Sequence, residues 1–280
     1  MPRRSIDALP LPSARYDVSK LDPELIKFET AADVAKEDRQ RSRRARIAKQ
    51  AGVKRTKRFR RLLRARSKSL ASATAMRERR RKVVGAIWEL VDAAGLANCS
   101  TVTLIPRAWT IPAKDLHATN PRKLIAQARS QLYRCGAKDA DGFLIAFLHG
   151  EYEPHSDTFV LHLHGVVSCG MRDVVDRFKG RRNYRHLDEE GRKLPIKGVR
   201  RSRQALSNMP APLTYLLQSY WPSRWKGQNA KGQSIRQRDK SRIPEPRHTE
   251  VLMWLDRWSL SDITLSIGVT WGNRGARLSH

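Results

Sequence analysis

The sequence predicts an α+β fold, in which helices flank a central antiparallel β-sheet and a basic, helical or disordered extension comes first. Two apolar runs, residues 142–150 and 159–168, have the length and composition of buried strands. Segments with apolar residues at helical spacing lie on both sides of these runs. Basic residues cluster ahead of the first such segment, which places the extension at the N-terminus.

The elements follow from local signals. Helical spacing predicts a helix over residues 83–94, which Gly95 would end. Residues 101–105 have the pattern of a strand, and residues 121–133 that of a helix with Asn120 and Pro121 as its N-cap and first residue. The turn at 153–157 is too short for a parallel crossover, so the two apolar strands should form an antiparallel hairpin. Helices are expected at 171–179, 206–220 and 250–258, and residues 266–280 could add a strand.

The charge of the chain indicates a polyanionic partner. Lys and Arg number 56 against 27 Asp and Glu, a formal net charge of +29 on 280 residues. Such an excess repels itself unless a polyanion neutralises it, and nucleic acid is the most natural one; a membrane surface is the weaker alternative. The chain has no apolar run of about 18 residues, and its first residues lack the apolar core of a secretory signal. A cytoplasmic, DNA-associated protein is therefore expected.

The charge distribution divides the chain into three parts. Residues 1–37 carry four prolines and few large apolar side chains, which predicts a flexible lead-in. Residues 38–82 are a basic segment in which no apolar core is expected, and residues 83–280 form the globular domain. The basic segment is either a DNA-contacting helical region or a solvated, disordered charge run. The DNA-contacting interpretation assigns Arg43, Arg44, Arg58, Arg60, Arg61, Arg79, Arg80 and Arg81 to the interface.

The strand at 159–168 contains His162-Leu163-His164. Alternate residues of a strand point to one face, so the two imidazoles should lie side by side while Leu163 points the other way. Imidazole is a common ligand of divalent transition metals, which makes this pair a candidate metal site. The alternative is a pair of histidines with a purely structural role.

Three motifs in order resemble those of the HUH endonuclease family, and within it the rolling-circle replication initiators of bacterial plasmids and phages. They are the apolar strand at 101–105, the strand with His162 and His164, and the later segment Pro212-Leu-Thr-Tyr215-Leu-Leu-Gln218-Ser-Tyr220. The similarity covers roughly residues 98–225, and the histidine motif is the closest to the family type. It implies an endonuclease fold of the ferredoxin or RRM type.

The resemblance implies a metal-dependent nickase and strand transferase. A tyrosine would attack a phosphodiester of single-stranded origin DNA, leaving a 5′-phosphotyrosine link and a free 3′-OH primer. Mn²⁺ or Mg²⁺ would be held by His162, His164 and a third ligand from the neighbouring strand, Glu151 first and His149 next. Host helicase and polymerase are the expected partners, since the sequence contains no P-loop motif.

The third motif departs from the family pattern at Gln218, where these initiators usually have lysine. This departure leaves the nucleophile open between Tyr215, which is preferred for its apolar context, and Tyr220. It also predicts that arginine replaces the missing lysine in contacting phosphate. The candidates on this part of the DNA-binding surface are Gln218, Arg201, Arg203 and Arg224.

Two other classes of protein fit the same sequence. An HUH-type transposase or mobilisation relaxase would use the same chemistry on another DNA substrate. A non-catalytic basic nucleic-acid-binding protein would need only the charged surface. The two classes differ in site completeness, because catalysis requires Tyr215 and the histidine pair to meet in one cleft.

Overall fold

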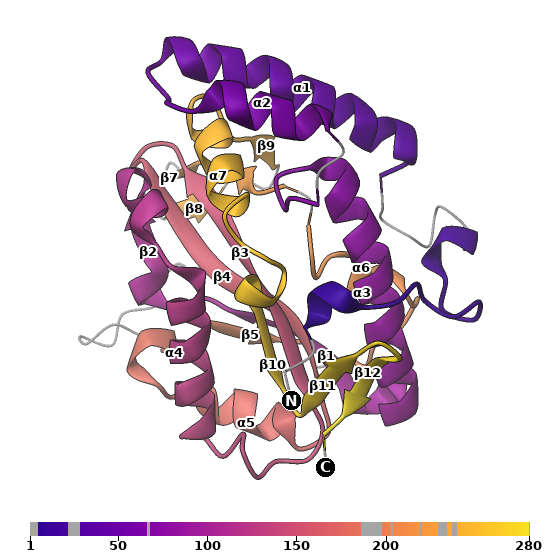
Figure 1. The fold of residues 1–280 in the computed structure, drawn as a ribbon. Coiled ribbons are helices and arrows are strands. Elements are labelled where there is room, and N and C mark those ends of the chain that lie inside the picture. The colour runs from indigo at the N-terminus through magenta and orange to yellow at the C-terminus, as the bar shows by residue number, and fades with distance from the viewer. Residues whose placement is uncertain are drawn as a thin grey trace.

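Strands from between residues 99 and 267 meet in one eight-stranded mixed sheet (Figure 1). The computed structural model describes residues 5–21, 29–65, 68–185, 198–202, 204–218, 220–228, 234–236 and 240–279. The strand order is β5-β1-β4-β3-β6-β9, with β2 also paired to β4 and β10 to β3. The strands are β1 (Cys99–Leu104), β2 (Thr110–Pro112), β3 (Leu144–Glu153), β4 (Thr158–Ser168), β5 (Val199–Arg201), β6 (Pro222–Ser223), β9 (Ser241–Arg242) and β10 (Thr264–Ile267).

The α+β class predicted from the sequence is confirmed. The central strands β1, β3 and β4 pair antiparallel as expected, and the sheet as a whole is mixed because β6 pairs with β3 in parallel through Tyr152 and Ser223. The expected hairpin is present: β3 and β4 are antiparallel, with His149 opposite His162. Every residue of β3 is buried, as expected of an apolar strand at the centre of a sheet.

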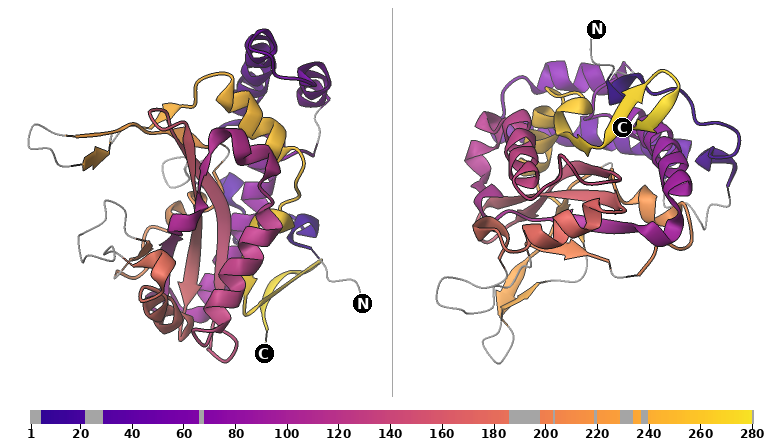
Figure 2. Two further views of the ribbon diagram at one scale, coloured as in Figure 1. Left: turned by 90° about the vertical axis from the view of Figure 1, so that its left-hand side faces the viewer. Right: turned by 90° about the horizontal axis from the view of Figure 1, so that it is seen from below.

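Helices cover one face of the sheet. Figure 2 shows α4 (Pro121–Tyr133) and α7 (Arg247–Leu255) on one side, while the hairpin of β7 (Lys226–Gln228) and β8 (Ser234–Arg236) projects from the other. Helix α4 has the predicted bounds, and the Asn120 side chain accepts a hydrogen bond from the Arg122 N–H as its N-cap. Further elements outside the N-terminal helices are α5 (Met171–Phe178) and the hairpin of β11 (Val269–Gly272) and β12 (Gly275–Leu278). Short 3₁₀ turns lie at Ile6–Ala8, Val18–Lys20, Leu96–Asn98, Arg107–Trp109, Ala113–Ala118, Arg182–Tyr184 and Ser261–Ile263.

The basic segment forms three helices: α1 (Ala31–Gln50), α2 (Thr56–Arg64) and α3 (Ala73–Ala94). Helices α1 and α2 lie side by side at the top of Figure 1, next to α7. The expectation that this segment has no core is wrong, because Phe59, Leu63 and Met76 are buried in the main hydrophobic cluster. The helix expected from residue 83 begins at Ala73, so the boundary between the basic segment and the globular domain falls inside α3.

The lead-in also packs against the domain where the structure describes it. Ile6, Leu9 and Val18 are each no more than 3% exposed and belong to the same hydrophobic cluster. Burying three large aliphatic side chains stabilises this segment by several kcal/mol relative to leaving them in water, at about 1.5–3 kcal/mol each. None of the described helices is long and apolar enough to cross a membrane.

Asp38 on α1 connects the basic helices. Its buried carboxylate accepts hydrogen bonds from the N–H groups of Ala73 and Thr74 and from the Ser72 hydroxyl, at the N-terminus of α3 (2.7–3.1 Å). We expect Asp38→Ala to lower the free energy of unfolding by about 2–3 kcal/mol, because three donors lose their acceptor. Chemical denaturation measures this, and Asp139→Ala at an exposed site should change it by less than about 0.5 kcal/mol. Equal effects of the two variants would contradict this role.

Glu37 on α1 makes stability depend on acid pH. Burial raises its pKa, but hydrogen bonds and charges from Arg242 and Arg41 outweigh this and lower it from 4.5 to about 2. A lowered carboxylate pKa stabilises the fold above pH 4.5, and this contribution is lost as pH falls toward 2. We expect Glu37→Gln to lose on the order of 2 kcal/mol at pH 7 and little at pH 2.5, in urea titrations at both pH values. Glu78→Gln, at an exposed site on α3, is the control, and a pH-independent loss would argue against this pairing.

The prediction of a helix over residues 206–220 is wrong. Among the described residues of this range a single turn forms, α6 (Ala211–Thr214), and Tyr215 is its C-cap. In a helix the carbonyls of Thr214 and Leu216 would accept backbone N–H groups four residues later. Here the Arg80 guanidinium donates to the Thr214 carbonyl at 3.0 Å, and the His149 imidazole bonds the Leu216 carbonyl at 2.8 Å. These tertiary hydrogen bonds hold the tyrosine-bearing segment against α3 and β3 instead.

Candidate functional site

Three histidines share one face of the central strands. His162 and His164 are two residues apart on β4, and His149 lies directly opposite His162 on β3. Directly opposed residues of antiparallel strands point to the same face, so all three imidazoles lie on one side of the sheet. Their ring centroids are 4.6 Å (His162–His164), 5.0 Å (His149–His164) and 6.1 Å (His149–His162) apart.

Hydrogen bonds orient the two histidines of β4. The Nδ1 of His162 donates to the Val160 carbonyl at 3.0 Å, which leaves its Nε2 as an acceptor. The Nε2 of His164 lies 3.0 Å from that atom and donates to it, while its Nδ1 lies 3.0 Å from the Thr103 hydroxyl on β1. A hydroxyl can donate or accept, so Thr103 can support either tautomer of His164. Bonds of this kind on the distal ring nitrogen are what orient histidine ligands in metal sites.

Burial keeps His149 and His164 uncharged. Desolvation lowers the pKa of His149 to about 3, and the neighbouring His162 lowers it further in the same direction. Desolvation also lowers the pKa of His164 far below its usual value, with added repulsion from His162 and His149. Neutral imidazole is the form that binds a metal ion.

The two Nε2 atoms are close enough for one metal ion to contact both. They lie 3.0 Å apart, a distance that here is the hydrogen bond between the two rings. To hold an ion together, both rings would have to present an unprotonated Nε2. His162 and His164 would then supply two nitrogen ligands of a divalent metal site.

The third ligand remains a choice between Glu151 and His149. Among the described residues, no three His, Cys, Asp or Glu side chains are grouped as a ready metal site. Glu151, on the same face of β3, has one carboxylate oxygen 3.4 Å from the Arg224 guanidinium, and the Nε2 of His149 bonds the Leu216 carbonyl. Glu151 would have to exchange this contact for a metal ion, whereas His149 could keep its bond to Leu216 and offer Nδ1.

Tyr215 lines the same cavity as the three histidines. The cavity has a volume of about 250 Å³, and Glu151, Gln218 and Arg224 also contribute to its wall. Tyr220 instead lines a neighbouring cavity beside Arg41 and Arg242, which does not include the histidines. Both tyrosines are partly exposed, Tyr215 at 51% and Tyr220 at 41%, so their position and not their accessibility separates them.

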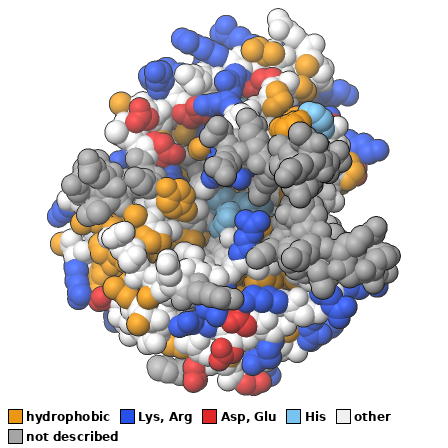
Figure 3. Space-filling model, turned by 180° about the vertical axis from the view of Figure 1, so that it is seen from behind, with side chains coloured by type: hydrophobic (Ala, Val, Ile, Leu, Met, Phe, Trp, Pro, Cys, Tyr) orange, Lys and Arg blue, Asp and Glu red, His pale blue; other side chains and the backbone are white. Residues whose placement is uncertain are grey.

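Positive charge surrounds the histidines. Thr103, Arg200 and Lys240 line the cavity and were not predicted as site residues. Figure 3 shows histidine side chains in a hollow near the middle of this face, with Lys and Arg side chains beside them. Arg200 could have been found only from the strand register: it pairs with Thr103 on β1, which in turn pairs with His164, so the three residues share a face. No pattern in the sequence around Lys240 predicts that it reaches this cavity, because the histidines lie far away from it in the chain.

The predicted DNA-binding arginines divide into several groups. Arg43, Arg58 and Arg61 are exposed, and Arg44 and Arg60 are partly buried. The prediction that Arg80 lies on a DNA-binding surface is wrong, because the residue is only 3% exposed. Its guanidinium donates hydrogen bonds to the Glu29 carboxylate and the Thr214 carbonyl. Arg79 is partly buried, and two other arginines form ion pairs, Arg81 with Asp17 and Arg201 with Asp176. Gln218 and Arg224 line the histidine cavity. Arg203 lies outside the described residues.

No protein-family model, curated protein or solved structure matches this chain.

Proposed function

We propose that this protein is a metal-dependent DNA nickase of the HUH endonuclease type that initiates rolling-circle replication. The observation that carries the proposal is that Tyr215, His162 and His164 line one cavity. A tyrosine hydroxyl beside a histidine pair is the combination that a phosphotyrosine-forming nuclease requires. A purely structural histidine pair gives no reason for a half-exposed tyrosine at the same opening.

The proposed reaction exchanges one phosphoester for another. The Tyr215 oxygen attacks phosphorus, the bond from phosphorus to the 3′ oxygen breaks, and the DNA 5′ end stays on the tyrosine. The phenol proton passes to solvent, and the departing 3′ oxygen takes up a proton to become a free hydroxyl. This hydroxyl can prime synthesis, and attack by a new 3′-OH on the phosphotyrosine reverses the exchange.

The residues of the cavity have separate roles in this proposal. His162 and His164 would hold Mn²⁺ or Mg²⁺, with Glu151 or His149 as the third ligand, and the ion would act as a Lewis acid on the scissile phosphate. Arg200, Arg224 and Lys240 place positive charge where the phosphate would bind. The family usually has a lysine where this chain has Gln218. In this proposal Arg200, Arg224 and Lys240 supply the positive charge that such a lysine would provide.

The same cavity serves the alternatives of the same class. An HUH-type transposase or relaxase would use Tyr215 in the same way on another DNA substrate, and the order of the motifs favours the initiator, since relaxases usually carry the tyrosine ahead of the histidines. A non-catalytic nucleic-acid-binding protein is less favoured, because it would not require Tyr215 and the histidine pair to meet. An initiator of this kind would act with a host helicase and polymerase on single-stranded origin DNA.

Covalent adduct formation tests the proposal. The purified protein is incubated with labelled single-stranded oligonucleotides from its own replicon, with Mn²⁺, Mg²⁺ or EDTA, and resolved on a denaturing gel. We expect a labelled protein-DNA band with either metal and none with EDTA. Binding without any adduct in either metal would favour the non-catalytic alternative.

A further inference from the structure

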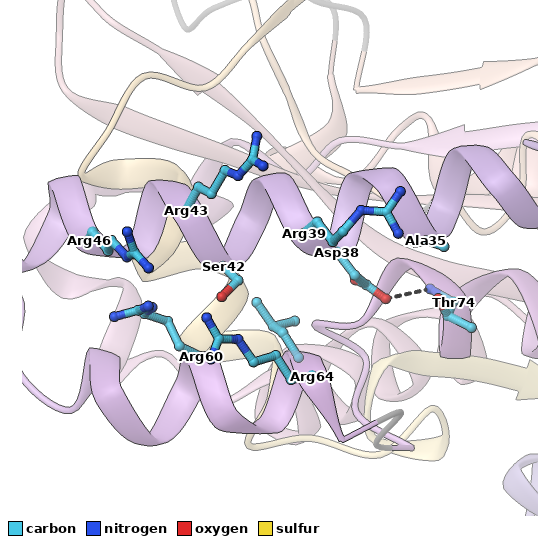
Figure 4. A pocket seen from close by; sticks show the side chains of 10 residues that line it. Ala35, Asp38, Arg39, Ser42, Arg43, Arg46, Arg60, Arg64 and Thr74 are labelled. Atoms are coloured by element: carbon cyan, nitrogen blue, oxygen red, sulfur yellow. Dashed lines mark hydrogen bonds between the residues drawn. The ribbon is translucent and has the colours of Figure 1, made fainter.

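A second cationic site lies between α1 and α2, away from the histidine cavity. A groove of about 700 Å³ between these helices is lined by Arg39, Arg43, Arg46, Arg60 and Arg64. In Figure 4, Arg46 of α1 and Arg60 and Arg64 of α2 point toward one another across the gap. We call these three residues the arginine cluster.

No described side chain neutralises the cluster. Among the described residues, no ion pair involves Arg46, Arg60 or Arg64, and the Nε of Arg60 is buried without a hydrogen-bond partner. Partial desolvation lowers the pKa of Arg60 below its usual value, and the charges of Arg46 and Arg64 add to this effect. Like charges held together around an unpartnered donor are unfavourable unless an anion joins them.

Asp38, the acidic residue among the described residues that line the groove, cannot serve as that anion. Both carboxylate oxygens of Asp38 accept hydrogen bonds from the start of α3, and Figure 4 shows its bond to Thr74. Residues four apart on a helix are one turn apart, so Arg39 and Arg43 extend the positive charge along α1. The charge therefore forms a track along the groove, not a single point.

We propose that this groove binds the sugar-phosphate backbone of nucleic acid, with the arginine cluster contacting successive phosphates. Planar guanidinium groups bind phosphate through two parallel hydrogen bonds, and a track of them suits a polymer of phosphates better than a single ion. The inference rests on the proposed DNA substrate but not on the nicking chemistry. It differs from the alternative of a solvated, disordered charge run, because α1 and α2 pack on each other and bury Phe59 and Leu63.

Helix α1 connects the groove to the part of the protein that contains the histidine cavity. The side of α1 turned away from the cluster carries Glu37, which binds Arg242 of β9 through two hydrogen bonds (2.6 and 2.8 Å). Lys240, directly before β9, lines the histidine cavity. DNA held in the groove would therefore be anchored to the same element that reaches the cavity.

Binding measured without metal tests this inference independently of catalysis. Fluorescence anisotropy in EDTA gives the affinity for labelled single-stranded and duplex DNA across a salt series, for the wild type and for the double variant Arg46→Gln, Arg60→Gln. Loss of two phosphate contacts should reduce the slope of log affinity against log salt concentration by about 1.8 for duplex DNA or about 1.4 for single strands. The affinity at 0.1 M salt should fall roughly 10- to 100-fold. Arg274→Gln, Arg277→Gln removes the same charge from the exposed, distant β11–β12 hairpin and should change the slope far less.

The outcomes are distinct. A loss of DNA affinity in the cluster variant alone supports binding of DNA in the groove. The type of DNA whose affinity falls, duplex, single-stranded or both, identifies what the groove binds. Equal losses in the cluster and hairpin variants, or no loss in either, would overturn the inference. If the double variant unfolds at a lower temperature than the wild type, Arg46→Gln alone is compared with Arg277→Gln by the same slope. Failure to nick DNA in the adduct assay leaves this experiment unaffected, so the two proposals fail separately.

Discussion

Tyr215→Phe is expected to abolish the covalent protein-DNA adduct completely. Phenylalanine lacks the oxygen that would bond to phosphorus, so no residual rate through this position is possible. The side chain is 51% exposed, so loss of its hydroxyl should change the free energy of unfolding by less than about 0.5 kcal/mol. A denaturing gel of labelled oligonucleotide with Mn²⁺ measures the adduct, and thermal unfolding confirms that the variant is folded.

Tyr220→Phe is the matched control, because it removes the same group from a tyrosine of similar exposure. Tyr220 lines the cavity beside Arg41 and Arg242 and not the one that holds the histidines. Its variant should form the adduct at a rate within a few-fold of the wild type. An adduct that persists in Tyr215→Phe and disappears in Tyr220→Phe would transfer the role of nucleophile to Tyr220.

The second large effect is expected at the histidine pair. His162→Ala should weaken Mn²⁺ binding and adduct formation by at least about 100-fold, because loss of residues that merely orient a ligand already costs about 10- to 100-fold in metal affinity. Calorimetric titration of the protein with Mn²⁺ measures the binding without requiring DNA or catalysis. The alanine also removes the donor to the Val160 carbonyl, so an unfolding curve must accompany the titration.

His155→Ala provides the control for the metal titration. His155 is an exposed histidine in the turn after β3, where it accepts a hydrogen bond from the Trp225 indole at 2.6 Å. It does not line the histidine cavity, so its variant should bind Mn²⁺ as the wild type does. If His162→Ala and the wild type gave the same titration, the metal would have to bind elsewhere, and a structural role for the histidine pair would be favoured.

Local signals predicted those parts of the fold that local interactions determine. Asn120 and Pro121 mark the start of α4, and the short turn after Glu153 requires an antiparallel hairpin, so both elements appear as predicted. The helix around Tyr215 was predicted by the same local reasoning and is absent. There, Arg80 and His149 bind backbone carbonyls from more than 60 residues away in the sequence, and no local pattern records such contacts.

The candidate site shows the same division. The facing of His162 and His164 follows from the alternation of a strand, and the register of β3 against β4 then brings His149 to them. Which arginine reaches the cavity depends on a one-residue register: Arg200 lines it, while Arg201 points to Asp176. Lys240 arrives through β9, whose place in the sheet depends on long-range pairing. In the same way, Phe59 and Leu63 are buried because α2 packs on α1, although their neighbours in sequence are mostly arginines.

Peptide mass mapping of the adduct tests the central claim most directly. The protein is incubated with its single-stranded origin oligonucleotide and Mn²⁺, treated with nuclease to leave a short nucleotide remnant, and digested with protease. The account predicts the mass of that remnant on the peptide that contains Tyr215, joined through a phosphodiester to the tyrosine oxygen. A remnant on any other residue, or no modified peptide while DNA binding is retained, would contradict it.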